Sequence, residues 1–475
     1  MVKTRRSRRN WSSLLVIILF CIAAAQFVRP VIANPPVTRD IAAPPEVEQV
    51  LRKSCYNCHS NETRLAWFDR LTPANWLVAG HIRDGRRALN FSEWDSLTRD
   101  QQKTKLFESL YQAERDAMPL SQYLLLHPGS KITAGDIAVL KNYLGAQTPS
   151  VTFDTARTGA ADRQFRQWIA ANPSPAAAPT AANPSPPSAA AGSVVQPEFN
   201  GIPFQADFSN WRSISTTERF DNGTTRAILG NDAAIRAISD HHTNPWPDGV
   251  AFAKVAWAQS PDMAGNIHTG EFRQVEFMIK DKNKYASSEG WGFARWVKGL
   301  QLAPYGKDAL FVTECANCHR PMASNDFVFT IPLHPHEFSL PDSSASKPLE
   351  GKVITTIVDK KNKTLSTLYG NDIAVQAARR GHTGIYPPGS VLSFVTWTQQ
   401  ADPHYFGANI PGAVRSVEKI SFGKEIRKAS PQKDEWASCY EIYEGTPLKR
   451  QAERNAGNSK NRMAWILALR ASVMP

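Results

Sequence analysis

The chain has 475 residues, enough for about three domains, and its hydrophobic content of 42% excludes a chain that is disordered throughout. Its formal net charge is +12, of which Lys3 and five arginines supply +6 before residue 34, a stretch without acidic residues. The remaining +6 is modest for this length, and no nucleic-acid-binding motif accompanies it. We therefore expect a surface that favours an acidic protein partner rather than a nucleic acid.

The N-terminal stretch, residues 1–33, has the pattern of a signal sequence or an uncleaved membrane anchor. Five basic residues precede the mostly apolar run WSSLLVIILFCIAAAQF at 11–27. A spanning helix needs about 20 apolar residues, so this run is at the short end. The basic side of such a run stays cytoplasmic. We expect residues 34 onward to lie in the periplasm, either anchored at the inner membrane or secreted across it.

Two copies of the pattern Cys-x-x-Cys-His carry the main chemical signal of the chain: CYNCH at 55–59 and CANCH at 315–319. In the c-type pattern both thiols form thioethers to a haem, and the histidine becomes an axial iron ligand. A zinc-type cysteine pair or chance is the alternative, and two copies behind an export signal disfavour it. The pattern predicts two covalently bound c-type haems, held by Cys55, Cys58, His59, Cys315, Cys318 and His319.

The other two cysteines are Cys21, in the apolar N-terminal run, and Cys439. Because the motifs use four of the six cysteines, no disulfide framework is expected. We expect Cys439 to be a buried thiol.

Residues 45–148 predict a small all-α domain. Pro45 suits the first turn of a helix that leads into the first motif. Thr133 and Asp136 resemble a capping box, with Asp in place of the usual Glu or Gln, that opens the last helix of the domain.

The sixth iron ligand of the first haem must come from outside the motif. Met118, followed by Pro119, is the only methionine between residues 34 and 150. A thioether ligand raises the reduction potential and fills the second axial position, which favours electron transfer. We expect Met118 to be this ligand, with His81 and His127 as alternatives and core packing as the structural explanation.

Residues 149–197 are interpreted as a Pro/Ala-rich linker. The part from 171 to 197 has seven prolines and no charged residue. Proline-rich chains are extended, so we expect a semi-rigid spacer.

Beyond the linker the sequence changes to β-type alternation and contains an internal repeat. ILGNDAAIRA at 228–237 matches LYGNDIAVQA at 368–377, and PDGVAFAKVAWAQ at 247–259 matches PPGSVLSFVTWTQ at 387–399. The second copy ends without a Cys-x-x-Cys-His pattern. We therefore predict a haem-bearing domain at 198–340 and a degenerate, haem-free copy at 341–475.

Lys254 stands out in the first copy. In a predicted strand over 249–258, it shares one face with Val250, Phe252 and Ala256, so it should point at an apolar layer. Burying an ammonium group is unfavourable unless the group is paired or neutralised. The alternative is an edge strand from which the lysine extends to solvent. In the second copy, Phe394 occupies the equivalent position.

Two family resemblances follow from these segments. The first rests on CYNCHSNETRLAWFDRLTPANWLVAGHIRDGRRALNFSEW at 55–94 and MPLSQYLLLHP at 118–128. These segments resemble the small haem-binding cytochrome domain of bacterial exported proteins. The second resemblance rests on five segments of the first copy: RFDNGTTRAILGNDAAIRA at 219–237, PDGVAFAK at 247–254, GEFRQVEFMIKD at 270–281, GWGFARWV at 290–297 and ECANCHRPMASNDFVFT at 314–330. Together they resemble cytochrome P-460.

The second resemblance implies a mainly antiparallel β fold and a haem attached near its C-terminal end. It also implies a lysine bonded to the porphyrin, which maps onto Lys254, and a glutamate, which maps onto Glu276. The distal face of the iron is open in this family and hydroxylamine is oxidised there, whereas the related c-prime-beta cytochromes lack the lysine bond and bind nitric oxide. His268, Glu271 and Glu314 are looser acid–base candidates.

The sequence thus predicts a multidomain α + β protein: an exported dihaem c-type cytochrome that oxidises hydroxylamine and passes electrons through its N-terminal haem to a periplasmic carrier. The alternatives are a nitric-oxide-binding cytochrome and a plain electron-transfer protein, which would need a sixth ligand such as Met263 or Met278 at the second haem. A further alternative treats the second copy as an interaction module that docks a partner.

Overall fold

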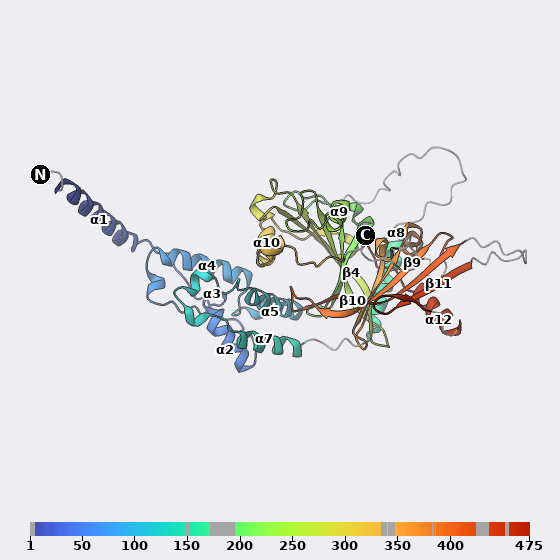
Figure 1. The fold of residues 1–475 in the computed structure, drawn as a ribbon. Coiled ribbons are helices and arrows are strands. Elements are labelled where there is room, and N and C mark those ends of the chain that lie inside the picture. Colours follow the sequence, from blue (N-terminus) through green and yellow to red (C-terminus); the bar gives the residue numbers. More distant parts are fainter. Residues whose placement is uncertain are drawn as a thin grey trace, which may run out of the picture. The chain divides into compact units, whose positions relative to one another are not determined.

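The computed structural model describes residues 5–147, 153–171, 195–333, 340, 347–381, 384, 386–423, 437–451 and 456–475. The chain divides into two compact units, Met1–Thr148 and Pro149–Pro475. The first is helical and the second contains a large antiparallel sheet (Figure 1). The predicted order, a helical region followed by an antiparallel β region, is confirmed.

The N-terminal unit is built mainly of helices, and both predicted helix starts are confirmed. Pro45 lies in the first turn of its helix, and Thr133 and Asp136 form a capping box. Tyr56 and Phe91 stack in the core with their ring centroids 5.2 Å apart. The helices are α1 (Arg5–Ala25), α2 (Pro45–Ser54), α3 (Tyr56–His59), α4 (Ala74–Ala88), α5 (Arg99–Glu114), α6 (Ser121–Leu124) and α7 (Ala134–Ala146).

Helix α1 covers most of the predicted leader. Within the part of the chain that the structure describes, no helix is long and apolar enough to cross a membrane.

The β-rich unit confirms the internal repeat element by element. The first copy contains β1 (Arg212–Arg219), β2 (Thr224–Gly230), α9 (Asp232–Ser239), β3 (Ala251–Pro261), β4 (Asn266–Lys280), β5 (Trp291–Val297), β6 (Ala303–Pro304) and α10 (Val312–His319). The second contains β7 (Lys352–Asp359), β8 (Thr364–Gly370), α11 (Asp372–Arg379), β9 (Val391–Ala401), β10 (Ala408–Gly423), β11 (Ala437–Glu444), β12 (Lys449–Arg450) and α12 (Ala456–Leu467). The helix after β2 and the helix after β8 both begin at an asparagine cap, Asn231 and Asn371.

The two copies pair their strands reciprocally within one twelve-stranded sheet. Strand β1 of the first copy pairs with β10, where Arg219 lies opposite Ala408. Strand β7, the counterpart of β1, pairs with β4, the counterpart of β10, and Asp359 lies opposite Asn266. The same pair of surfaces is therefore used twice, as at the interface of a two-fold symmetric dimer.

One hydrophobic core is shared by both copies. It includes Trp257 from β3 and Trp397 from β9, and also Val473 near the C-terminus. The Trp257 indole N–H donates to the Val473 carbonyl oxygen at 2.7 Å. The two copies thus form one compact unit.

The predicted linker contains a helix at its N-terminal end. Helix α8 (Thr155–Ala171) packs onto β3 and β4. It buries Ala161, Phe165 and Trp168, which recur at the spacing of one helix face. The stretch at 172–194 lies outside the described residues.

The prediction of a buried Cys439 is wrong. This residue lies on β11 and is exposed. It lies opposite Ser421 of β10, whereas the two-residue strand β12 reaches only Tyr443 and Glu444. Among the described residues, no strand pairs with Cys439 on its other side.

A buried carboxylate joins the two copies. The Glu218 side chain is fully buried. It forms an ion pair with Lys360 and accepts hydrogen bonds from Gln399 Nε2 at 2.5 Å and Asn409 Nδ2 at 2.8 Å. These three partners belong to the second copy, and Gln259 of the first copy also donates to Glu218 Oε1, at 3.5 Å.

We predict that Glu218→Ala lowers the free energy of unfolding of the β-rich unit by about 3–5 kcal/mol, because it leaves the Lys360 charge and two amides without their acceptor. The control is Glu444→Ala, at an exposed position, which should change it by less than about 0.5 kcal/mol. Urea unfolding of both variants tests this, and equal effects would contradict a joining role for Glu218.

Candidate haem sites

The first motif lies where two helices approach closely. Cys55 follows α2, and α3 carries Cys58 and His59. A Cβ atom added to Gly85 of α4 would lie 2.6 Å from the Cys58 carbonyl oxygen, so only glycine fits there. Both thiols are unpaired, and burial raises the pKa of Cys55 to about 12. No disulfide joins the two cysteines, so both sulfur atoms are available for the thioether bonds that the motif predicts.

His59 is prepared to bind a metal through one nitrogen. Its Nδ1 lies 3.1 Å from the Leu89 carbonyl oxygen. Because a carbonyl only accepts, Nδ1 carries the proton and Nε2 keeps its lone pair. Burial lowers the pKa of His59, which favours the neutral ring. A hydrogen bond of this kind orients the ligating histidine in metal sites.

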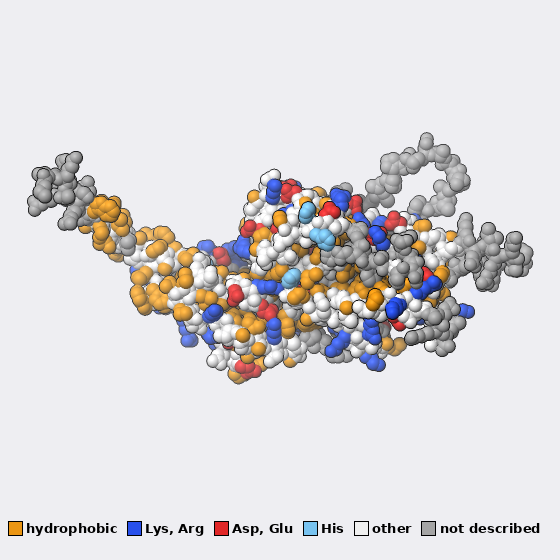
Figure 2. Space-filling view, in the orientation of Figure 1, with side chains coloured by type: hydrophobic (Ala, Val, Ile, Leu, Met, Phe, Trp, Pro, Cys, Tyr) orange, Lys and Arg blue, Asp and Glu red, His pale blue; other side chains and the backbone are white. Residues whose placement is uncertain are grey.

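Large apolar side chains are exposed in the N-terminal unit. Figure 2 shows hydrophobic side chains gathered on it. Exposed side chains of the segment that follows the motif are Trp67, Leu71, Trp76, Leu77, Met118, Leu125 and Leu126. Monomeric soluble proteins leave few such groups uncovered. Together with the thiols and His59, they fit a haem, whose ring is apolar.

The structure distinguishes the three candidates for the sixth ligand. Met118 is 37% exposed. His127 has both ring nitrogens occupied: Nε2 lies 3.1 Å from Asp69 Oδ2, and Nδ1 lies 3.2 Å from the Tyr123 carbonyl oxygen. His81 Nε2 accepts from Gln122 at 2.8 Å. Met118 would bind the iron without breaking a hydrogen bond of this kind, so it remains our predicted sixth ligand.

The second motif lies on α10 and has the same histidine arrangement. His319 Nδ1 lies 2.7 Å from the Phe327 carbonyl oxygen, so it donates and leaves Nε2 free to bind iron. Burial lowers the pKa of His319 to about 4. The rings of Phe293 and Phe329 lie 5.0 and 4.9 Å from the imidazole, centroid to centroid. The residues present at both motifs therefore fit a haem.

Charged side chains form a row across the sheet of the first copy. Lys254 on β3 lies opposite Glu276 on β4, which lies opposite Arg295 on β5. Lys254 and Glu276 form an ion pair, and Arg295 Nε lies 3.3 Å from Glu276 Oε1. These three groups act electrostatically on both Cys315 and His319. The structure thus brings Lys254 and Glu276 together next to the second motif.

The surrounding groups shift the pKa values of Lys254 and Glu276. Burial, with Arg226 and Arg295 nearby, lowers the pKa of Lys254 to about 8, against the opposing effect of Glu276. Burial alone would raise the pKa of Glu276, but Arg295 and Lys254 hold it well below the usual range. Glu276 is thus ionised, and Lys254 loses its proton closer to neutral pH than an ordinary lysine does.

The neighbouring row on the same face is apolar. Phe252, Met278 and Phe293 lie opposite one another on β3, β4 and β5 and belong to a buried cluster that contacts Cys315. Met278 is therefore close to the motif. Met263 is 87% exposed.

The looser acid–base candidates differ in their distance from the charged row, and only Glu314 acts on one of its members, Arg295. His268 pairs with Asp262 at 2.9 Å near the start of β4, and Glu271 pairs with Arg273 at 3.5 Å. Glu314 precedes Cys315 and accepts a hydrogen bond from the Tyr305 hydroxyl at 3.0 Å. Of the three, only Glu314 adjoins the haem motif.

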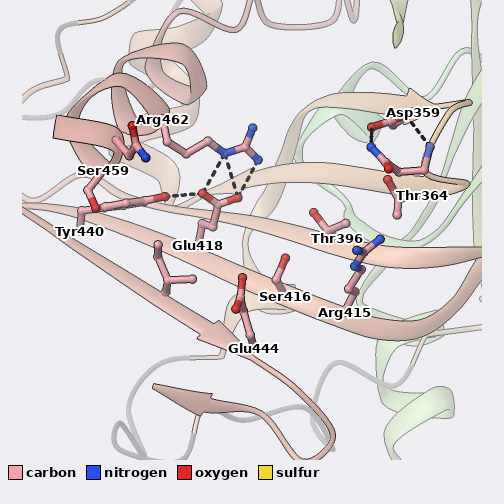
Figure 3. A pocket seen from close by; sticks show the side chains of 13 residues that line it. Asp359, Thr364, Thr396, Arg415, Ser416, Glu418, Tyr440, Glu444, Ser459 and Arg462 are labelled. Atoms are coloured by element: carbon pink, nitrogen blue, oxygen red, sulfur yellow. Dashed lines mark hydrogen bonds and ion pairs between the residues drawn. The ribbon is translucent and has the colours of Figure 1, made fainter. Parts of the chain in front are cut away.

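In the second copy, the sheet face equivalent to that of Lys254 and Glu276 is covered by an arginine from the same copy. Phe394 lies opposite Glu418, as Lys254 lies opposite Glu276. Glu418 accepts hydrogen bonds from Arg462 of α12 at 3.0 and 2.7 Å and from the Tyr440 hydroxyl, as Figure 3 shows.

The Arg462 guanidinium also lies over the rings of Phe394 and Trp465, 5.2 and 4.5 Å from their centroids. A polar pocket of about 470 Å³ remains beside it (Figure 3). Helix α12 contains neither cysteine nor histidine.

A turn of the second copy reaches the haem motif of the first. His404, between β9 and β10, has Nδ1 2.6 Å from the Phe329 carbonyl oxygen. The Tyr405 hydroxyl donates to Asp221 at 3.2 Å. The turn thus holds the segment 327–329, whose carbonyl at Phe327 accepts from His319. Sequence reasoning missed this contact and also missed Arg295, because only the strand register reveals them.

The comparisons with known proteins agree with this geometry. Residues 14–146 match the model of the haem-binding domain family, and residues 205–330 and 350–460 match that of cytochrome P460. A search among curated proteins found no match. The chain is a haem protein. It belongs to the cytochrome P460 family through both copies of its repeat, which follow a haem-binding domain.

We predict that Gly85→Ala disrupts the first haem site, because the new methyl group would overlap the Cys58 carbonyl oxygen. The haem-to-protein ratio of the purified protein should fall toward one, and stability should fall by about 1–3 kcal/mol. Gly80→Ala on the same helix is the matched control, because the nearest atom to its added Cβ is 3.9 Å away. Equal haem ratios and melting temperatures in both variants would refute the prediction.

Proposed function

We propose that this protein is an exported dihaem c-type cytochrome whose second haem site oxidises hydroxylamine, with the electrons leaving through the N-terminal haem. The observation that carries the proposal is the half-buried Lys254–Glu276 ion pair beside His319 and Cys315. In cytochrome P-460 a lysine at this position is bonded to the porphyrin. The lowered pKa of Lys254 supplies the neutral, nucleophilic amine that such a bond requires.

The residues of the row have separate roles in this proposal. When bound, haem supplies the electron acceptor. Hydroxylamine must release protons as it is oxidised, so a nearby base assists the reaction. While Lys254 is charged, Glu276 is a weak base because its pKa is low. If haem binding left Lys254 uncharged, Lys254 would no longer stabilise the Glu276 carboxylate, so the pKa of Glu276 would rise and the carboxylate would be a better proton acceptor.

The N-terminal haem domain serves as the electron exit. A Met118 ligand would fill the second axial position of the iron at His59 and leave that haem suited to electron transfer. The location outside the cytoplasm, the membrane attachment and the periplasmic carrier are part of the proposal. They rest on the basic and apolar leader at 1–33 and on the c-type motifs.

We further propose that the second copy carries no haem and acts as an internal partner of the first. The reciprocal strand pairs β1–β10 and β4–β7 support this, as does the ion pair of Glu418 and Arg462 in the place of the charged row. Light scattering that showed an obligate dimer formed through this same surface would contradict it.

We predict a second Soret band, well to the red of the ordinary c-type band, in the dithionite-reduced protein. Lys254→Arg should abolish that band together with hydroxylamine oxidation, because Arg cannot form the bond. Glu276→Gln should keep the band and lower kcat by about 10²- to 10⁴-fold. The control is Lys282→Arg, at a side chain that is 73% exposed.

Two ordinary c-type spectra in the wild-type protein would contradict the lysine bond. Nitric-oxide binding by the reduced protein without hydroxylamine turnover would then identify the c-prime-beta type of function.

We also predict that His404→Ala raises the reduction potential of the second haem. Losing the bond to the Phe329 carbonyl loosens the segment that accepts from His319 Nδ1, and a weaker bond there makes the imidazole a poorer donor to iron. His404→Asn keeps a donor near the position of Nδ1 and should restore the wild-type potential. Spectroelectrochemistry measures both variants, and an unchanged potential in His404→Ala would rule out this coupling.

A further inference from the structure

Cations gather on the haem-facing side of the first copy. Arg219, Arg226, Lys254 and Arg295 lie there around Asp221 and Glu276. Asp221 is the partner of Arg219, and Glu276 is shared by Lys254 and Arg295. Asp402 and Glu314 act on Arg219 and Arg295, so the carboxylates that act on Arg226 are Asp221 and Glu276, which already have partners.

Arg226 lies in this cluster with one nitrogen unbonded. It is only 9% exposed, and its Nε forms no hydrogen bond with any residue that the structure describes. It lies opposite Ala256, two residues along β3 from Lys254, and therefore on the face of the charged row. Burial and the nearby Arg219 lower the pKa of Arg226 to about 10, against the opposing effects of Glu276 and Asp221, so it is still charged at pH 7. Both carboxylates are already paired with other cations, and a buried guanidinium with an unbonded nitrogen is stabilised when a further anion joins it.

The repeat shows that these cations accompany the haem motif. The second copy keeps the carboxylate of Glu276, as Glu418. It replaces the four cations by Asp359, Ser366, Phe394 and Ile442, as the equivalent strands and their registers show. Both copies need these strands for the same sheet, so the sheet itself does not require the cations.

We propose that Arg226, with Arg295 beside it, forms an anion-binding subsite at the polar end of the second haem site. Its ligand is a small planar oxyanion group that the guanidinium can hold with two parallel hydrogen bonds. A propionate of the haem and a free oxyanion such as nitrite share this chemistry. The subsite requires haem at the second motif but does not depend on hydroxylamine oxidation, so it can be tested without turnover.

The test compares three variants of the full-length haem-loaded protein. Arg226→Ser introduces the residue of the equivalent strand position in the second copy. Arg226→Lys keeps the charge but loses the planar fork. Arg236→Ser changes an exposed arginine on α9 and is the control. The two measurements are the reduction potential of the second haem as a function of pH and a spectral titration with sodium nitrite.

If a propionate occupies the subsite, Arg226→Ser should lower the reduction potential of the second haem and shift its pH dependence, because a positive charge beside the haem is lost. The nitrite titration should then be the same as in wild type. A free oxyanion predicts saturable nitrite binding in wild type, weakened about tenfold or more in Arg226→Ser and less in Arg226→Lys. Potentials and titrations equal to those of wild type and Arg236→Ser would overturn the proposal.

If Arg226→Ser fails to fold, Arg226→Lys decides the question by the same two measurements. It should weaken nitrite binding or shift the pH dependence of the potential, because a point charge does not replace two directed hydrogen bonds. An unchanged Arg226→Lys protein would again overturn the proposal.

Discussion

The main-chain pairing between the two copies of the repeat is the constraint on which the rest of the β-rich unit depends. Strand β1 pairs with β10, and β7 pairs with β4, through equivalent residues. Hydrogen bonds between strands fix the register, and a slip by one residue would turn every side chain to the opposite face. The shared core, the burial of Glu218 among residues of the second copy and the position of the β9–β10 turn all follow from this register.

Within the first copy, the same two-residue period of the strands sorts the side chains into rows. One row holds Phe252, Met278 and Phe293, and the next holds Lys254, Glu276 and Arg295. The face therefore changes from apolar to charged over one step along the strands. Because this change occurs next to Cys315 and His319, it suits a group that is apolar over most of its area and carries charge at one edge, as haem does.

The sequence predicted those features that reside in local patterns. The haem motifs, the capping box at Thr133 and the repeat depend on spacing alone, and all three could be read without a structure. The partial burial of Lys254 followed from alternation along one strand. Arg226 and Arg295 could not be found this way, because they meet the site across strand pairs whose register has no sequence signature. His404 could not be found either, because it reaches the loop at Phe329 from a turn of the second copy. Helix α8 was within reach, since Ala161, Phe165 and Trp168 recur at helical spacing, but the proline-rich stretch beside it suggested a linker.

The two copies separate what the fold requires from what the chemistry requires. Both keep the glycine before the first helix, the asparagine cap and the buried tryptophan of the third strand, Trp257 or Trp397. Only one keeps the motif and the cations. In the other, Glu418 retains the position of Glu276 but takes Arg462 from the helix that stands in place of the haem-binding helix. A retained buried carboxylate needs a cation, and a neighbouring arginine meets that need within the protein. Arg226 in the first copy is the complementary case, in which the protein supplies a buried cation whose Nε has no acceptor among the described residues, and the proposed ligand supplies one.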